Sequence, residues 1–243
     1  MEKSGLLLFR YRGQLPLLIF LFVALVIPFT DYQNHSSCLR MAFHWGSALL
    51  VFLGMSVRFY TVGTAAPGTS GRNRDEQVAE RLNTTGIYSV VRHPLYLGNY
   101  LVWLGLVVFT ESVVFMLLFS LIYWVYYERI MLAEEAFIAN KFGQAFNEWS
   151  SEVPAFLPRL KGFIPPVVPF SFKPGLRGEY SGVISIALSY LYMEVLIGWV
   201  RYGKIVVGDR LLIACVVCIV ISLVLRTLKH HSRFLDRAYP ENV

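Results

Sequence analysis

The feature that most constrains this chain is the length of its apolar blocks. Six blocks of about fifteen to twenty residues occupy positions 15–29, 41–62, 95–109, 113–126, 182–200 and 211–225. Blocks of this length suit helices that cross the hydrocarbon core of a bilayer, which needs about 20 mostly apolar residues. We therefore expect an all-α fold, a polytopic integral membrane helical bundle of about six transmembrane helices.

The composition agrees with this expectation and excludes other classes. Hydrophobic residues make up 56% of the chain and charged residues 16%, against roughly a quarter charged in soluble domains. The formal net charge of +6 does not indicate a nucleic-acid partner, because basic residues of membrane proteins gather in cytoplasmic loops beside anionic lipid. The three cysteines have no histidine at ligand spacing, so we expect no metal site.

The distribution of Lys and Arg predicts the orientation. The amino terminus, the loop between the second and third blocks, the segment after the fourth block and the tail are all rich in basic residues. This pattern places both termini in the cytoplasm, and the basic link at residues 201–210 is the one exception. No small-x-small cleavage site follows the first block, so we interpret it as a retained helix of a multi-pass membrane protein.

The chain divides into three expected parts. These are an N-terminal transmembrane hairpin, a catalytic core and a C-terminal transmembrane hairpin with a basic tail, at residues 1–64, 65–160 and 161–243. The core begins with a polar loop and a short surface helix at 75–82. The third part begins in a proline-rich stretch, 153–174, which indicates an irregular connector.

A long helix is expected to leave the membrane after the fourth block. Residues 112–142 contain neither glycine nor proline, and a helix of that length spans roughly 45 Å. The hydrocarbon core is only about 30 Å thick. The helix should therefore project into the cytoplasm and carry its glutamates to the interface.

Two polar clusters lie on the predicted cytoplasmic side. In the first cluster, a helix that begins at the membrane surface explains Pro94 and Arg92. It does not explain Tyr96, Gly98 and Asn99 within an apolar helix, where polar groups are costly and indicate function. The second cluster contains Glu134-Glu135, which alone would be read as an ordinary solvated helix end.

Taken together, the two clusters resemble a known family. Arg92-His93-Pro94-Leu95-Tyr96-Leu97-Gly98 is followed by Glu134-Glu135, Phe142-Gly143 and Val153-Pro154. This order resembles the isoprenylcysteine carboxyl methyltransferases and the related phospholipid methyltransferases over residues 82–159. The resemblance implies an enzyme that uses S-adenosylmethionine, releases S-adenosylhomocysteine, and methylates a membrane lipid or lipid-linked acceptor at the cytoplasmic interface.

The charges of the methyl donor suggest a role for each candidate residue. Arg92 and His93 suit its carboxylate, Glu134 or Glu135 its ammonium, and a tyrosine its adenine or sulfonium. Glycine permits close approach of the cofactor or of a neighbouring helix. The candidate catalytic residues are Arg92, His93, Glu134 and Glu135. The candidate cofactor-binding residues are these four with Tyr88, Pro94, Tyr96, Gly98 and Asn99.

The acceptor and two other functions stay open. A carboxylate or phosphate oxygen needs no general base and suits the many loop cations, whereas an amine would have to lose a proton to His93 or a glutamate. One alternative is an NADPH-dependent membrane reductase of the steroid-reductase type, although no Gly-rich phosphate loop is present. A non-enzymatic transporter or scaffold is less favoured, because the polar residues gather at one interface.

Overall fold

The computed structural model describes residues 8–9, 11, 15–32, 34–66, 79–159 and 161–236. Within these residues the regular structure is helical and no strand occurs apart from one isolated bridge between Gly86 and Ile164. The all-α prediction is therefore confirmed. Of the short helix expected at 75–82, residues 75–78 lie outside the described part of the chain, and residues 79–82 are not helical.

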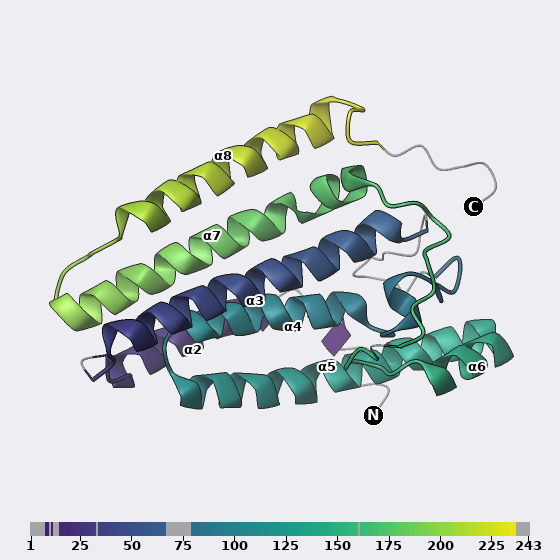
Figure 1. Cartoon of the computed structure of the whole chain (residues 1–243), viewed down its shortest axis with the longest axis horizontal. Coiled ribbons are helices and arrows are strands. Elements are labelled where there is room, and N and C mark those ends of the chain that lie inside the picture. The colour runs from purple at the N-terminus through teal and green to yellow at the C-terminus, as the bar shows by residue number, and fades with distance from the viewer. Residues whose placement is uncertain are drawn as a thin grey trace.

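The helices run up and down and lie side by side (Figure 1). Their bounds are α2 Leu15–Val26, extended by a 3-10 turn at Ile27–Phe29, then α3 Ser37–Thr64, α4 Pro94–Phe109, α5 Val113–Phe142, α6 Gln144–Glu152, α7 Phe172–Tyr202 and α8 Asp209–His231. Contacts join α8 to α7, α7 to α3, α3 to α4, and α4 to α5. The last two helices of this row, α4 and α5, carry the residues of the predicted site.

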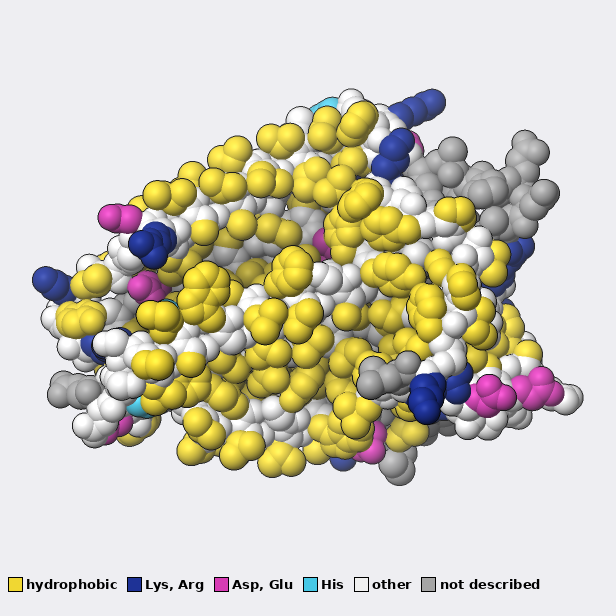
Figure 2. Space-filling view, in the orientation of Figure 1, with side chains coloured by type: hydrophobic (Ala, Val, Ile, Leu, Met, Phe, Trp, Pro, Cys, Tyr) yellow, Lys and Arg dark blue, Asp and Glu magenta, His cyan; other side chains and the backbone are white. Residues whose placement is uncertain are grey.

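Four helices, α3, α5, α7 and α8, are long and apolar enough to cross a membrane by length and composition. Their outer faces are covered by apolar side chains, and charged side chains gather toward the two ends of the molecule (Figure 2). These are the features of a multi-pass membrane protein. The count of six crossings stays a prediction, because the other two apolar helices, Ile19–Phe29 and Pro94–Phe109, are shorter.

Local sequence signals explain where these helices begin and end. Ser36 caps α3, its hydroxyl accepting from the backbone N–H of Leu39 at 3.2 Å. Ser112 caps α5 in the same way, and such caps satisfy donors that have no partner inside the helix. Pro94 opens α4, where its missing N–H is not needed. Gly143, with φ of 54°, ends α5 in a conformation that other residues avoid.

Glycines bring α3 and α4 into direct backbone contact. A Cβ atom on Gly54 would lie 2.6 Å from the carbonyl oxygen of Gly98. A Cβ on Gly105 would lie 2.8 Å from the carbonyl oxygen of Ser47. Small residues at a helix interface allow this approach in membranes, where packing rather than the hydrophobic effect holds helices together. The site helix α4 is thus seated firmly on α3.

Aromatic side chains fill the space between α4 and α5. Tyr123 and Tyr127 stack with ring centroids 4.1 Å apart, and Tyr96 packs on Tyr127 at 5.0 Å. Phe156, from the segment after α6, packs edge-on against Tyr100 of α4 and against Trp124 of α5, each at 5.7 Å. The two helices are therefore held apart by rings along the half that leads to the candidate site.

The connector before the C-terminal hairpin is shorter than predicted. α7 begins at Phe172 and has 31 residues, so the irregular segment ends at Ser171 rather than at 174. Pro174 lies in the first turn of α7, where proline leaves no hydrogen bond unmade. The expected long helix is confirmed as α5, a single helix of 30 residues. The three-part division of the chain stays a prediction.

Candidate active site

The turn that carries the first motif is shaped by backbone hydrogen bonds to the segment after α6. The N–H groups of Arg92 and His93 donate to the carbonyls of Pro154 and Ala155, at 2.9 and 3.1 Å. Arg159 donates its backbone N–H to the carbonyl of Val90 at 3.0 Å. A few residues earlier, Gly86 bonds to Ile164. The loop before α4 is therefore clasped by residues more than sixty positions later.

Arg92 and His93 converge on one carboxylate of α5. The Nε and Nη2 atoms of Arg92 lie 2.9 and 3.2 Å from the two oxygens of Glu135. His93 Nε2 lies 2.9 Å from Glu135 Oε1. Arg92 also donates from Nη1 to the carbonyl of Ser150 at 2.5 Å. Two candidate cations thus share a single anion at the start of α4.

The second glutamate completes the network. Tyr96 donates its hydroxyl to Glu134 Oε1 at 2.7 Å. His93 Nδ1 lies 3.6 Å from Glu134 Oε2, so the imidazole sits between the two carboxylates. The rings of His93 and Tyr96 stack at 5.6 Å, as residues three apart on one helical face can do. All four predicted catalytic residues and Tyr96 form one connected group.

This group is enclosed but reachable. The side chain of His93 is 8% exposed, those of Arg92 and Glu135 are 16% and 17% exposed, and that of Glu134 is 23% exposed. Arg92 Nε finds no well-aligned hydrogen-bond acceptor among the described residues, although it is buried and close to Glu135. The network is therefore largely buried, with Glu134 its most exposed member.

Tyr88 lies beside this network rather than inside it. Its backbone carbonyl accepts from the indole N–H of Trp149 at 3.0 Å, which ties the loop to α6. Burial, together with the nearby Glu134 carboxylate, raises the pKa of the Tyr88 phenol well above its ordinary value. The phenol therefore stays neutral at physiological pH and can serve as a ring surface or a hydrogen-bond donor.

Gly98 and Asn99 face α3. A Cβ atom on Gly98 would lie 2.6 Å from Arg58 Cγ. Two roles were expected for this glycine, close approach of the cofactor and close approach of a neighbouring helix, and this contact corresponds to the second. Asn99 Oδ1 accepts from Arg58 Nη1. Arg58 in turn binds Glu179 of α7 through Nε and Nη2, at 2.8 and 2.9 Å. A place for Gly98 and Asn99 in the donor pocket stays a prediction.

The sequence did not indicate Arg58 or Glu179 as neighbours of the site, whereas Trp149 belongs to the same predicted polar cluster as Glu134-Glu135. Charged residues within apolar helices are a usable signal for Arg58 and Glu179. Their separation of 121 positions gives no hint that they pair.

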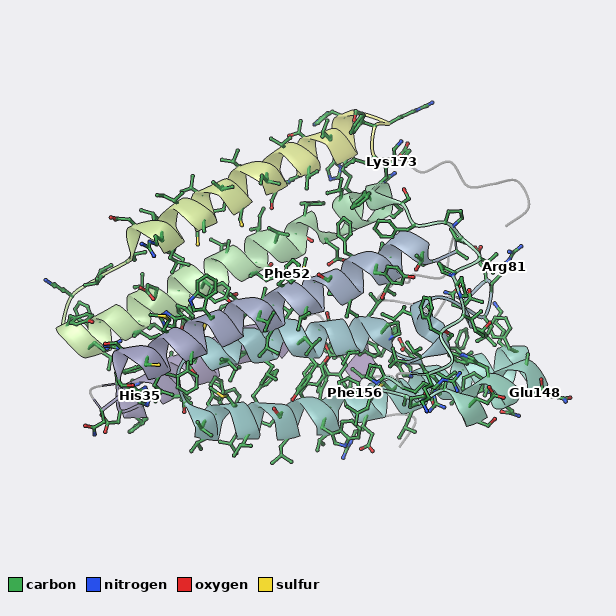
Figure 3. The ribbon with its side chains drawn as sticks, in the orientation of Figure 1. His35, Phe52, Arg81, Glu148, Phe156 and Lys173 are labelled. Atoms are coloured by element: carbon green, nitrogen blue, oxygen red, sulfur yellow. The ribbon has the colours of Figure 1, made fainter. Side chains whose placement is uncertain are left out.

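A second group of titratable residues lies at the opposite end of the bundle, where Figure 3 labels His35. Glu111, in the link between α4 and α5, is 2% exposed and lies 2.8 Å from His35 Nδ1. His44 Nε2 lies 3.5 Å from Glu111 Oε1. Burial raises the pKa of Glu111, but hydrogen bonds and attraction from the two histidines lower it more, so it lies below its ordinary value. No cluster in the described ranges has the geometry to hold a metal ion.

Known proteins match the part of the chain that carries the network. Residues 42–145 match the family model of phospholipid methyltransferases. A cobalt-zinc-cadmium resistance protein of Cupriavidus metallidurans is 40% identical over 119 residues, 48% of this chain and 52% of that protein. A nickel-cobalt-cadmium resistance protein of Alcaligenes xylosoxydans xylosoxydans is 36% identical over 122 residues, 49% and 54% of the two chains.

A third relative carries the name of an enzyme. The protein-S-isoprenylcysteine O-methyltransferase of Schizosaccharomyces pombe is 34% identical over 91 residues, 37% of each chain. The chain thus spans about half the length of the first two relatives and less of the third. No solved structure matches. The family model covers every predicted catalytic residue, from Arg92 to Glu135, and the predicted resemblance is confirmed over that region.

Proposed function

We propose that this chain, whose residues 42–145 match the phospholipid methyltransferase family, is an S-adenosylmethionine-dependent methyltransferase of the membrane. Its acceptor in this proposal is a membrane lipid or a lipid-linked group, reached at the cytoplasmic interface. The methyltransferase name of the Schizosaccharomyces pombe relative supports the reaction class. The exposed apolar faces of the long helices support a lipid environment.

The observation that carries this proposal is the network of Arg92, His93, Tyr96, Glu134 and Glu135. The amino-acid arm of the donor bears a carboxylate and an ammonium, and its sulfonium is positive. Arg92 offers a guanidinium that already contacts the two oxygens of a carboxylate, at 2.9 and 3.2 Å, and guanidinium binds carboxylates with two parallel hydrogen bonds. The two glutamates supply negative charge for the ammonium. The residues present therefore fit the donor.

The protein's contribution to the chemistry is position and exclusion of water. S-adenosylmethionine, when bound, supplies a methyl group on a positively charged sulfur. Arg92 and Glu135 orient its amino-acid arm, and the ring of Tyr96 or Tyr88 offers a face to adenine or sulfonium. Alignment of two reactants can account for much of the rate of such a transfer, and the side chains that do this are already held in place by hydrogen bonds.

A carboxylate or phosphate oxygen is the favoured acceptor. Such an oxygen is already a nucleophile and leaves no proton to be removed. Exposed cations, among them Lys161, Lys173 and Arg177, lie in the segment that leads from the site into α7, where they would attract an anionic lipid. An amine acceptor would need a base, and His93 between two carboxylates is the residue that could take the proton.

The test is binding of S-adenosylhomocysteine to the full chain in detergent, measured by calorimetry. Wild type is compared with Arg92→Ala and Glu135→Ala. The control is Arg129→Ala, which removes a charge from an exposed position of α5. We expect wild type to bind, both site variants to bind at least about tenfold more weakly, about 1.4 kcal/mol, and the control to bind within about twofold of wild type.

Other outcomes overturn the proposal or its finer part. A folded wild type that binds NADPH and not S-adenosylhomocysteine would establish the reductase alternative instead. If the donor binds, transfer of a labelled methyl group is measured to a prenylated cysteine, to phosphatidic acid and to phosphatidylethanolamine. Label found only in the ethanolamine lipid would contradict the preference for an oxygen acceptor.

A further inference from the structure

An ion pair inside the bundle links the C-terminal hairpin to the site helix. Arg58 of α3 and Glu179 of α7 form a two-pronged salt bridge, with N–O distances of 2.8 and 2.9 Å. Glu179 is 3% exposed. α7 lies against α3 along this stretch (Figure 1). The pair is therefore enclosed between two helices that both carry apolar outer faces.

Each of the two charges depends on the other. An ionised side chain within an apolar helix is costly, and such residues pair with one another when they persist. Bidentate contact between guanidinium and carboxylate is the strongest form of that pairing. Removal of one partner leaves a buried charge without compensation, which is more damaging than removal of both. The pair thus behaves as a unit that joins α3 to α7.

Arg58 also rests on the first two turns of α4. Its Nη1 donates to Asn99 Oδ1, and its stem fills the space in front of Gly98, where a Cβ atom would lie 2.6 Å from Arg58 Cγ. Asn99 follows Tyr96 by three positions, so the two lie one helical turn apart. Tyr96 in turn holds Glu134 at 2.7 Å. A continuous set of contacts therefore runs from Glu179 to the candidate site.

We propose that Glu179 is a positioning residue for the donor site. By holding the Arg58 guanidinium against Asn99, it fixes the start of α4 and so the direction of Tyr96 toward Glu134. This inference rests on the proposed function and extends it, because Glu179 lies in α7, beyond the residues that match the family. The C-terminal hairpin is thus part of the catalytic unit and not only a membrane anchor.

A second polar link between the same two helices provides the matched control. Ser47 of α3 lies 2.7 Å from the hydroxyl of Tyr190 of α7, and its own hydroxyl donates to the carbonyl of Gly105 at 2.6 Å. This link joins α3 to α7 as the salt bridge does, but it reaches the far half of α4. Tyr190→Phe therefore weakens helix packing without touching the first turns of α4.

The experiment compares full-length wild type, Glu179→Gln and Tyr190→Phe in detergent by two readouts. The first is affinity for S-adenosylhomocysteine, and the second is amide hydrogen exchange of residues 94–101. We expect Glu179→Gln to bind about tenfold more weakly, about 1.4 kcal/mol, and to exchange faster in this segment. Tyr190→Phe should match wild type in both readouts.

A double variant separates positioning from simple attachment. Arg58→Met with Glu179→Met removes both charges and keeps apolar bulk, a change that is often neutral or stabilising for a buried pair. We expect its thermal stability to return toward that of wild type while its affinity for S-adenosylhomocysteine stays low, because the hydrogen bond from Arg58 to Asn99 is then lost. Recovery of wild-type affinity in the double variant would overturn the inference.

The remaining outcomes distinguish this inference from the proposed function. Binding by wild type together with unchanged binding and exchange in Glu179→Gln would overturn the positioning role alone. Absence of binding by wild type would overturn the methyltransferase proposal. In that case the exchange of residues 94–101 still decides whether Glu179 holds the start of α4, since that readout needs no ligand.

Discussion

Replacement of Glu135 by glutamine should destabilise the protein more than the same change at Glu134. Glu135 receives three contacts, at 2.9 and 3.2 Å from the Arg92 guanidinium and at 2.9 Å from the His93 imidazole. Glu134 accepts a hydrogen bond from a neutral hydroxyl, that of Tyr96, and lies 3.6 Å from His93. The two adjacent carboxylates of α5 therefore have different partners, and the loss of each should have a different effect on stability.

The expected magnitudes follow from these contacts. A hydrogen bond to a charged group contributes about 1.5–3 kcal/mol, and a neutral one about 1 kcal/mol. Glutamine at 135 keeps one acceptor oxygen but leaves Arg92 without its counter-charge, so we expect a loss of about 2–3 kcal/mol. Glutamine at 134 can still accept from Tyr96, so we expect a loss of about 1 kcal/mol or less.

Thermal unfolding in detergent measures this difference. For a chain of this size about 1 kcal/mol corresponds to roughly 2–4 °C, so Glu135→Gln should lower Tm by about 4–12 °C and Glu134→Gln by no more than about 4 °C. Glu128→Gln, an exposed carboxylate on the same helix, should change Tm by no more than about 2 °C. Equal shifts for the two site variants would refute the idea that Glu135 anchors both Arg92 and His93.

Three further predictions concern other parts of the structure. Glu111, whose pKa is lowered overall by its histidine partners, contributes stability that is present above its ordinary pKa and is lost as pH falls through the lowered value. Wild-type Tm should therefore drop on acidification below about pH 4, whereas Glu111→Gln should start lower at neutral pH and change less. Gly98→Ala places a methyl group 2.6 Å from the Arg58 stem and should cost about 1–3 kcal/mol in thermal unfolding. Gly46→Ala, on α3 with open space around it, should be neutral or stabilising, and equal losses at both glycines would contradict the packing argument. Tyr96→Phe removes the hydrogen bond to Glu134 and should weaken S-adenosylhomocysteine binding about threefold to tenfold by calorimetry; unchanged affinity would exclude that bond from the donor site.

Much of the helical framework could be predicted from the chain because apolar length and helix signals agree. The expected blocks at 95–109 and 113–126 are the observed α4 and the first half of α5. Their three-residue link requires an antiparallel hairpin, and the absence of glycine and proline predicts that α5 continues to Phe142. The proline-rich pattern predicts a connector up to residue 174, but α7 begins at Phe172, because Pro174 stands in its first turn.

The composition of the site was predictable and its supports were not. His93 and Tyr96 share a helical face, and the Glu134-Glu135 pair lies on the opposing helix, so motif spacing was enough to expect their meeting. The salt bridge between Arg58 and Glu179 depends on how α7 packs against α3, which no local pattern encodes. The turn at Arg92 is shaped by hydrogen bonds to backbone carbonyl groups. Every residue has such a group, so the sequence does not indicate which carbonyls form these bonds.

During synthesis, the turn that carries Arg92 and His93 stays open long after these residues leave the ribosome. Its backbone partners, Pro154 and Ala155, follow about sixty residues later, which at about 5–20 residues per second takes roughly 3–12 s. Before that interval ends, α4 and α5 can already pair in the bilayer, but the turn still lacks the backbone hydrogen bonds that shape it. A nascent chain that ended at residue 145 would possess every predicted catalytic side chain. It would still lack the Pro154 and Ala155 carbonyls that bind the turn before α4.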